Sequence, residues 1–325
     1  MENISVSRAK QFKSCKLAYK YIYEDKFVPA IKAPADVTNK GLVMHETFEA
    51  LTHYENYNEP VVDANGKQNW GEPVKAYRQA PLPTIMSAFQ HTMEENKLPI
   101  AVAEKYNLKR GLKRWLSFKH DYLDPRGTIL YAEKKYVLPI FGNTKTTAIL
   151  DLLEDMGDGT YVIYDYKTPS KANPNNYKFQ LMVYAYLMAT VKGLIQPNST
   201  DYQTVAKHFK CYIFFPLCDG EHEDYKDSLK QLKFTAKDVE KAIEDLKADC
   251  AAIDAFDFNK PAEALQPTTA STKGPCGWCD YCGAKPQPEI GFEGCPITAF
   301  IGCMQKSTFM RPENWVDPKA PKLIK

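Results

Sequence analysis

The chain has 325 residues, of which 44% are hydrophobic and 25% charged, so it is an ordinary globular protein with room for one large domain or two small ones. No apolar run approaches the roughly 20 residues needed to span a bilayer, and the first residues, MENISVSRAKQFKSC, lack the apolar core of a signal peptide. We therefore expect a cytoplasmic protein, either bacterial or encoded by a phage and made in the host cytoplasm. Nine cysteines in a reducing compartment indicate metal binding or burial rather than disulfides, and a net charge of +2 neither supports nor excludes nucleic acid as a partner.

Hydrophobic periodicity and turn signals predict an α/β fold, with a mixed central sheet flanked by helices. A polar, breaker-rich segment at 55–73 is expected to be a surface loop, and the last part, 259–325, shows little periodicity. Helices are predicted at 5–24, 41–54, 82–96, 100–120, 177–191 and 235–255, and strands at 128–139, 145–155, 160–167 and 210–216.

Five basic residues gather in the fourth predicted helix. Lys105, Lys109 and Lys113 follow one helical face at i, i+4 spacing, and Arg110 and Arg114 lie beside them. Such a run is usually a solvated helix face. It could also follow the phosphate backbone of DNA, so these residues are candidate DNA contacts.

The stretch YVIYDYKTPSK, residues 161–171, places two charges in an apolar strand. Asp165 and Lys167 are two positions apart and therefore on the same face. Buried charges are costly unless they are paired or bind a metal. An ion pair at a fraying strand end and a metal site are both compatible with this stretch alone.

The turn Gly157-Asp158-Gly159 decides which residues oppose Asp165. If the hairpin is centred on Asp158, Asp151 lies directly across from Asp165, at a separation where like charges repel. Two carboxylates at that distance in an apolar sheet favour a divalent cation between them. A two-residue turn would instead place Asp151 opposite Tyr166 and remove the argument.

Glu133 comes from the preceding strand, within about two positions of Asp151, and its face is not fixed by the sequence. An exposed strand residue between lysines is the alternative. Carboxylate oxygens with a nearby lysine suit Mg²⁺ or Mn²⁺ better than zinc. Such an ion can activate a water and neutralise charge on a phosphoryl group, while the lysine orients that water.

Asp151 followed by Asp165-Tyr166-Lys167 resembles the signature of the PD-(D/E)XK nuclease superfamily. QLMVY, with Gln180 and Tyr184, is similar to the QxxxY motif of its RecB-like branch, and GLVMHETFEAL, with Gly41 and His45, to the motif that supplies a metal-binding histidine. The chain departs from the family pattern at Ala148, where a glycine is usual. This resemblance covers about residues 5–295 and implies a restriction-endonuclease-like core.

Four cysteines, Cys276, Cys279, Cys282 and Cys295, lie within 20 residues near the C-terminal end. Their C-x2-C spacing suits either a local zinc knuckle or an iron–sulfur cluster. The family resemblance implies a 4Fe-4S cluster that joins the two ends of the chain through Cys15, Cys276, Cys279 and Cys282, with Cys295 as the alternative fourth ligand. Structural zinc remains the alternative cofactor, and Cys211, Cys218, Cys250 and Cys303 are expected to be packing or incidental thiols.

The resemblance implies a Mg²⁺- or Mn²⁺-dependent DNA exonuclease of recombination, repair or phage DNA metabolism, similar to CRISPR-associated RecB-like and phage recombination exonucleases. Its DNA would be single-stranded or have a free end, and recombination or replication proteins are expected partners. Asp151, Asp165, His45, Glu133 and the Tyr166 carbonyl would hold the ion; Lys167 would position the water, and Gln180 and Tyr184 would hold DNA or brace the site.

A structure-specific endonuclease and a non-catalytic iron–sulfur or zinc DNA-binding module are the alternative functions. No phosphate-binding loop of the G-x-x-x-x-G-K-[ST] type occurs in the sequence, so we expect activity without ATP. We expect a single nuclease domain over 1–325, with a helical part at 1–127, a catalytic core at about 128–216 and the cysteine region at 259–325.

Overall fold

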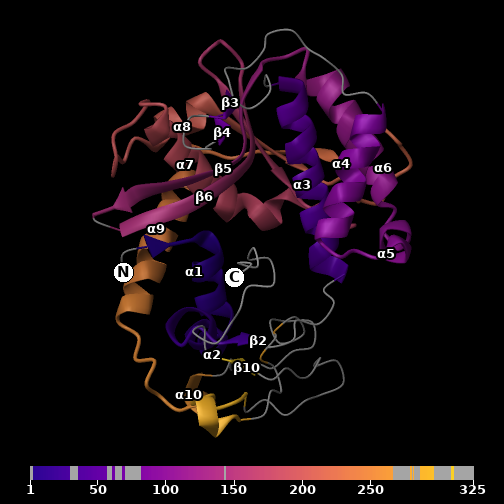
Figure 1. Ribbon diagram of the computed structural model, residues 1–325. Coiled ribbons are helices and arrows are strands. Elements are labelled where there is room, and N and C mark those ends of the chain that lie inside the picture. Colours follow the sequence, from indigo (N-terminus) through magenta and orange to yellow (C-terminus); the bar gives the residue numbers. More distant parts are fainter. Residues whose placement is uncertain are drawn as a thin grey trace. The chain divides into compact units, whose positions relative to one another are not determined.

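The computed structural model divides into two compact units, one made of residues 35–245 and the other of both chain ends, 3–34 and 246–325. Figure 1 shows the helices and strands of both. The described residues are 3–29, 36–56, 61–62, 68–69, 82–142, 144–265, 279, 281, 286–295 and 309–310.

A mixed sheet forms the centre of the 35–245 unit, as predicted. Among the described residues of this unit its strand order is β5-β6-β7-β8-β9, with β7 and β8 parallel and the other neighbours antiparallel. The predicted strands are all present, and the sequence missed the short β9. The bounds are β5 Thr128–Phe141, β6 Thr144–Asp155, β7 Tyr161–Tyr166, β8 Phe209–Phe214 and β9 Leu229–Leu232.

The β6–β7 hairpin has the register centred on Asp158. Leu152 pairs with Tyr164, Asp155 pairs with Tyr161, and the N–H of Met156 donates to the carbonyl of Thr160. Gly157 and Gly159 have φ of 77° and 82°, a conformation that glycine adopts without strain. The next position beyond the Leu152–Tyr164 pair therefore places Asp151 opposite Asp165.

Helices cover both faces of this sheet (Figure 1). Tyr164 and Tyr166 of β7 pack in a core cluster with Phe48 of α3 and with Trp115 and Phe118. The intervening Asp165 instead bonds to helix α7. Because alternate side chains of a strand point to opposite faces, α3 and α7 lie on opposite faces of the sheet. The two helices converge on β7 from either side.

The predicted helices of this unit are present except for one break, and the sequence missed the short helix α8 Tyr202–His208. The helix predicted at 100–120 is interrupted at Asn107, whose φ of 50° is left-handed and whose side chain caps the following helix. In the expected loop at 55–73, the first two residues belong to α3, and two short strands, β3 Val61–Val62 and β4 Gln68–Asn69, pair antiparallel. The other residues of this segment lie outside the described part of the chain. The helices are α3 Asp36–Asn56, α4 Leu82–Glu95, α5 Ile100–Lys105, α6 Leu108–Ser117, the π-helix η2 Phe118–Leu123, the 3-10 helix η3 Pro174–Tyr177, α7 Lys178–Val191 and α8 Tyr202–His208.

The second unit packs the N-terminal helices against C-terminal residues. Tyr21 donates its hydroxyl to the carbonyl of Gly294 at 2.6 Å, and Tyr281 donates to the carbonyl of Phe27 at 2.7 Å. The helix predicted at 5–24 is broken at Cys15, whose backbone is extended. The elements are β1 Asn3–Ile4, α1 Val6–Ser14, α2 Lys16–Tyr19, the π-helix η1 Lys20–Glu24, β2 Val28–Pro29, α10 Ala262–Leu265, the 3-10 helix η5 Pro288–Ile290 and β10 Phe309–Met310, and α9 Ala236–Asp254 belongs partly to each unit.

Helix α9 begins as predicted, because the Asp238 carboxylate accepts from both the N–H and the hydroxyl of Thr235. Most of the predicted irregular segment 259–325 lies outside the described residues. Among the described helices, none has the length and apolar character needed to cross a bilayer.

Candidate active site

The site lies where β7 ends and receives side chains from α3, β5, β6, β7 and α7, all within the 35–245 unit. Asp151 of β6 is buried and anchors it: the N–H of Tyr166 donates to Asp151 Oδ2 at 2.5 Å, and Oδ1 lies 3.6 Å from His45 Nδ1. Burial raises the pKa of the Asp151 carboxyl, and the charges of His45 and Lys167 oppose that rise.

His45 of α3 links three elements of the site. Its Nδ1 lies 3.0 Å from Glu133 Oε1, and its Nε2 lies 3.1 Å from the carbonyl oxygen of Tyr166. Burial lowers the pKa of the imidazole, but Asp151 and Glu133 outweigh burial and raise it to about 9. The imidazolium therefore donates one hydrogen bond to a carboxylate and one to a backbone carbonyl.

Glu133 reaches the site through an unusual backbone conformation. Its φ is 46°, in the left-handed region that non-glycine residues seldom occupy. The pairs on either side, Ala132 with Leu152 and Lys134 with Leu150, place it across from Asp151. The sequence could not reveal this kink, because it depends on how the glutamate is held rather than on local propensity. Backbone strain of this kind persists where surrounding contacts hold it, often at functional sites.

One nitrogen and two carboxylate oxygens from His45, Glu133 and Asp151 lie within 4.8 Å of one another. This donor set fits a divalent cation, since a neutral imidazole and carboxylate oxygens are ligands that Mn²⁺ and Mg²⁺ accept. The predicted carbonyl ligand of Tyr166 lies beside this group, hydrogen-bonded to His45.

Asp165 lies next to these three residues but is held by other partners. Its Oδ2 is 2.7 Å from Lys167 Nζ, and its Oδ1 accepts from Gln180 Nε2 at 3.3 Å. Burial raises the pKa of Asp165 to about 6, Asp151 adds to the rise, and Lys167 opposes it. Burial lowers the pKa of Lys167, but Asp165 and Asp151 more than reverse this, so the ammonium stays charged at neutral pH.

The two motif residues of α7 extend this chain of contacts. Gln180 Nε2 also donates to the Tyr184 hydroxyl at 3.1 Å, so the amide bridges Asp165 and Tyr184. The sequence did not single out Tyr177, whose ring centre lies 5.3 Å from Lys167 Nζ. Its position just before α7 carries no distinctive spacing, and only the fold brings it to the lysine.

Gly41 of α3 lies against the loop that follows Lys167. A Cβ atom at this position would lie 3.4 Å from Thr168 Oγ1, in the loop that follows Lys167. This is close to an ordinary van der Waals separation, so α3 packs closely against the end of β7 at Gly41 without requiring the glycine.

The prediction of a basic DNA-binding helix is wrong for Arg114. Its side chain is fully buried, and its guanidinium donates to the carbonyls of Cys218 at 2.7 Å and His222 at 2.7 Å. Arg110 also donates to the carbonyls of Gly220 and His222, and Lys113 pairs with Glu223 at 3.0 Å. These residues hold the loop after β8, which the sequence could not show because the contact spans about 100 residues.

The break at Asn107 also separates the other predicted DNA contacts. Lys105 ends α5 and Lys109 belongs to α6, so the two do not share one continuous helical face. Both are exposed. Lys109 lines a groove of about 650 Å³ between α4 and the start of α6.

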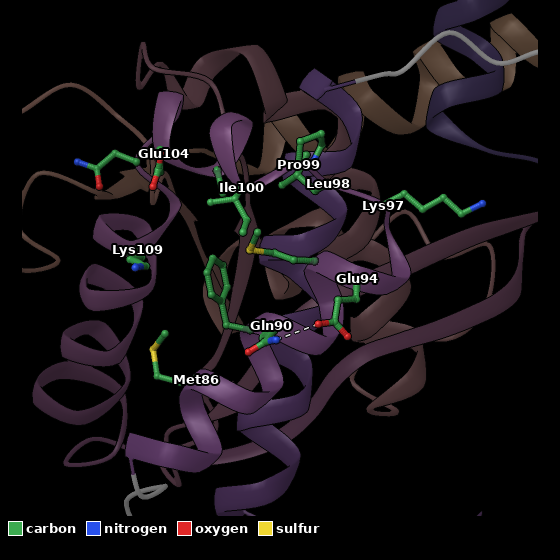
Figure 2. Close-up of a pocket in the computed structure, with 13 residues that line it drawn as sticks. Met86, Gln90, Glu94, Lys97, Leu98, Pro99, Ile100, Glu104 and Lys109 are labelled. Atoms are coloured by element: carbon green, nitrogen blue, oxygen red, sulfur yellow. Dashed lines mark hydrogen bonds between the residues drawn. The ribbon is translucent and has the colours of Figure 1, made fainter.

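Figure 2 shows this groove, which is separate from the carboxylate site. Its lining is mostly apolar and includes Met86, Phe89 and Ile100, while the Gln90 amide bonds to Glu94 at 2.9 Å. Two acidic residues and two lysines contribute to the lining, so its charge is balanced: Glu94, Glu104, Lys97 and Lys109. Balanced charge gives no attraction for a phosphate backbone.

Three of the predicted cluster cysteines are described, and all three belong to the unit of the chain ends. Cys15, Cys279 and Cys295 pack against one hydrophobic cluster that includes Tyr21. Cys15 Sγ accepts from the N–H of Ala18 at 3.4 Å. Cys276, Cys282 and Cys303 lie outside the described residues, and Cys211, Cys218 and Cys250 are buried, as expected of packing thiols.

A mixed sheet with helices on both faces, and an Asp…Asp-x-Lys site beside a metal-competent histidine and glutamate, define a protein of the metal-dependent nuclease type. The family model of the PD-(D/E)XK nuclease superfamily matches residues 3–286, and the chain belongs to this superfamily. No curated protein matches the chain.

Proposed function

We propose that the protein is a Mg²⁺- or Mn²⁺-dependent DNA exonuclease of the RecB-like branch. The observation that carries the proposal is the placement of His45, Glu133 and Asp151 within ligand distance of one another, next to the buried Asp165–Lys167 pair. Membership of a nuclease superfamily supports hydrolysis of phosphodiester bonds in DNA. Gln180 and Tyr184 support the assignment to the branch, since they contact Asp165 directly or through one another.

In this proposal His45, Glu133, Asp151 and Asp165 hold the cation, with the Tyr166 carbonyl beside it. When bound, a divalent cation activates water and neutralises charge on the phosphoryl group. To accept the cation, His45 must release the proton that it shares with Glu133 and Asp151. Lys167 remains protonated, so it does not act as the base but orients the attacking water and stabilises negative charge on the phosphate.

Next to the proposed metal site, the Gln180 amide hydrogen-bonds to both Asp165 and Tyr184 and so restricts the orientation of their side chains. We propose that Gln180 and Tyr184 either brace Asp165 or contact the DNA backbone through their amide and hydroxyl groups. Lys105 and Lys109 remain proposed DNA contacts because both are exposed, whereas Arg110 and Lys113 have partners in the loop after β8.

We also propose that the two units act together as one nuclease domain stabilised by a 4Fe-4S cluster. Cys15, Cys279 and Cys295 contact one hydrophobic cluster, which supports a joint site for cysteines from both chain ends. The hydrogen bond from Ala18 to Cys15 Sγ would stabilise a thiolate there. Roles in recombination, repair or phage DNA metabolism, with DNA and recombination or replication proteins as partners, follow from this proposal.

End-labelled DNA with one blocked terminus tests the function. Purified protein with Mn²⁺ or Mg²⁺ should shorten single-stranded DNA progressively from a free end, and ATP should not change the rate. Circular single-stranded DNA of equal length should survive. Cleavage of the circle would assign an endonuclease instead, and no hydrolysis with either metal would contradict the nuclease assignment.

A further inference from the structure

Five side chains near the metal-competent residues form a group that we call the Tyr–Lys cluster: Tyr131, Lys134 and Tyr136 of β5, Tyr161 of β7 and Lys192 at the end of α7. The rings of Tyr131 and Tyr136 meet edge to face, with centres 5.8 Å apart. Tyr161 stacks on Phe209 at 5.5 Å, which fixes its ring. The cluster thus presents aromatic rings in set orientations.

Two lysines lie over these rings. Lys134 Nζ is 4.2 Å from the centre of the Tyr131 ring and 5.7 Å from that of Tyr136. Lys192 Nζ is 5.2 Å from the Tyr131 ring and 5.1 Å from the Tyr161 ring. Lys134 is exposed, and the three tyrosines and Lys192 are half-buried, so parts of the cluster are open to solvent.

The cluster begins at the candidate active site. Glu133 directly precedes Lys134, and Tyr131 is two residues before Glu133, which is roughly 7 Å along a strand. Among the described strands β5 pairs only with β6, so no further strand covers its other edge. A DNA strand with one phosphate at the carboxylates would therefore have the cluster within reach.

The charge near the cluster favours a polyanion. Lys134 and Lys192 supply two positive charges at the cluster. Two acidic residues lie nearby. Glu133 belongs to the metal-competent group. Burial raises the pKa of the Tyr161 hydroxyl, and the nearby charge of Asp155 raises it further. Once a divalent cation occupies the carboxylates, the local charge is positive.

We propose that the Tyr–Lys cluster is a binding platform for single-stranded DNA, on which unpaired bases stack against Tyr131 and Tyr161 while Lys134 and Lys192 contact phosphates. The proposal rests on the proposed nuclease function and names its substrate class. Aromatic rings interleaved with lysines bind single strands without sequence preference, because every base has a face to stack. In a duplex the bases already stack on one another, so the platform favours single strands.

Binding is measured with the full-length wild type in chelator, so that no DNA is cut. The probes are a labelled oligothymidine and a blunt DNA hairpin of equal charge, followed by fluorescence anisotropy. Tyr131→Leu and Tyr161→Leu keep apolar volume but remove the ring, and each should weaken oligothymidine binding about tenfold, with little change for the hairpin. Both variants should keep the unfolding midpoint of the parent.

Tyr23→Leu is the matched control, because the half-buried Tyr23 ring also carries a cation, Arg8 at 4.9 Å from the ring centre, but belongs to η1 in the unit of the chain ends. It should bind oligothymidine like the parent. Unchanged binding in both platform variants, or an equal loss in Tyr23→Leu, would overturn the platform. Lysines on an edge strand can also serve to prevent aggregation, and in that case Lys134→Ala lowers solubility while affinity is unchanged, which likewise counts against it.

Failure of the platform is distinguishable from failure of the nuclease. If the wild type with Mn²⁺ cuts DNA while the platform variants bind single strands normally, the nuclease proposal survives and the platform is rejected. If the wild type cuts no DNA but the platform variants lose oligothymidine binding, the cluster is a single-strand site of a binding protein.

Discussion

The Lys167–Asp165 pair shows why a charged pair can persist in a sheet that is otherwise apolar. Asp165 is almost fully buried and Lys167 only 23% exposed, so each would be costly without the other. Asp151 adds a second negative charge, which raises the pKa of Asp165 and helps to keep Lys167 protonated. The two carboxylates therefore repel each other, and a bound divalent cation would offset this repulsion.

Removal of Lys167 alone, compared with removal of both partners, should distinguish the effect on catalysis from the effect on stability. Lys167→Met leaves Asp165 buried without its cation, so we expect a loss of about 3–5 kcal/mol in unfolding free energy and nuclease activity reduced at least about 100-fold. The double variant Asp165→Asn/Lys167→Met should recover most of the stability and none of the activity. Urea unfolding and cleavage of labelled DNA measure the two effects.

The exposed pair of Lys241 and Asp245, which lie 2.9 Å apart, is the matched control, since Lys241→Met should change neither quantity. Wild-type cleavage rates in Lys167→Met would remove this lysine from the chemistry.

His45 gives the metal-free protein a defined pH dependence. Its pKa is raised from 6.5 to about 9, so the protonated form stabilises the fold at pH values below 6.5, and this contribution is lost as the pH rises through 9. The loss should approach about 3 kcal/mol. Asp165, with a pKa near 6, is already ionised by then, and the raised pKa of Asp151 acts in the same direction as His45.

Urea unfolding in chelator at pH 6.5, 8 and 9 measures this slope. His45→Gln should flatten it, whereas His91→Gln, at an exposed position beside Glu95, should leave it unchanged. Parallel slopes in wild type and His45→Gln would mean that the imidazole does not carry the proton.

At the scale of elements, the loop after β8 is held by a buried arginine. Arg114 of α6 donates to backbone carbonyls of Cys218 and His222, and the same loop is tied to the loop after β7, because the N–H of Asp219 donates to Ser170. Ser170 is three residues beyond Lys167. A fully buried guanidinium thus fixes a segment that borders the candidate active site.

Arg114→Lys should release this loop. An ammonium lacks the planar fork that reaches separate carbonyls, so we expect a loss of about 2–4 kcal/mol in unfolding free energy and new proteolytic cleavage at 216–228. Lys113→Met, which breaks only the exposed pair with Glu223, should cost less than about 1 kcal/mol. Equal protease resistance in both variants would show that other contacts hold the loop.

The sequence predicted elements better than long-range contacts. Glycines around Asp158 fixed the β6–β7 register, so the opposition of Asp151 and Asp165 could be worked out from local turn chemistry. Asn107 and Cys15 each interrupt a predicted helix, because left-handed or extended residues leave no trace in hydrophobic periodicity. Arg114 looked like a DNA contact because an amphipathic pattern does not reveal which loop covers a helix.

At the scale of the whole molecule, the chain ends form one unit although more than 200 residues separate them. Lys20 pairs with Glu293 at 2.8 Å, and the Tyr21 and Tyr281 hydroxyls each bond across the two ends. These contacts do not require a metal. A metal cluster bound by cysteines of both chain ends would add a second link between segments that already pack together.

Cys15→Ala separates the two cofactors proposed for these cysteines. A zinc knuckle of Cys276, Cys279, Cys282 and Cys295 is local and would be indifferent to residue 15. A cluster that includes Cys15 closes a loop of more than 250 residues, a restraint worth roughly 4–5 kcal/mol. We expect anaerobically purified wild type to be brown with a broad visible absorbance band, and Cys15→Ala to lose the band and unfold at markedly lower temperature.

Cys211→Ala, at a buried position in β8, controls for the loss of a thiol, since it should keep the colour even if it lowers stability through packing. Colourless wild type with one stoichiometric zinc, and Cys15→Ala unfolding like wild type, would assign the knuckle. Because the carboxylate site draws all its residues from 35–245, the Mn²⁺-dependent nuclease test stands whichever metal the cysteines hold.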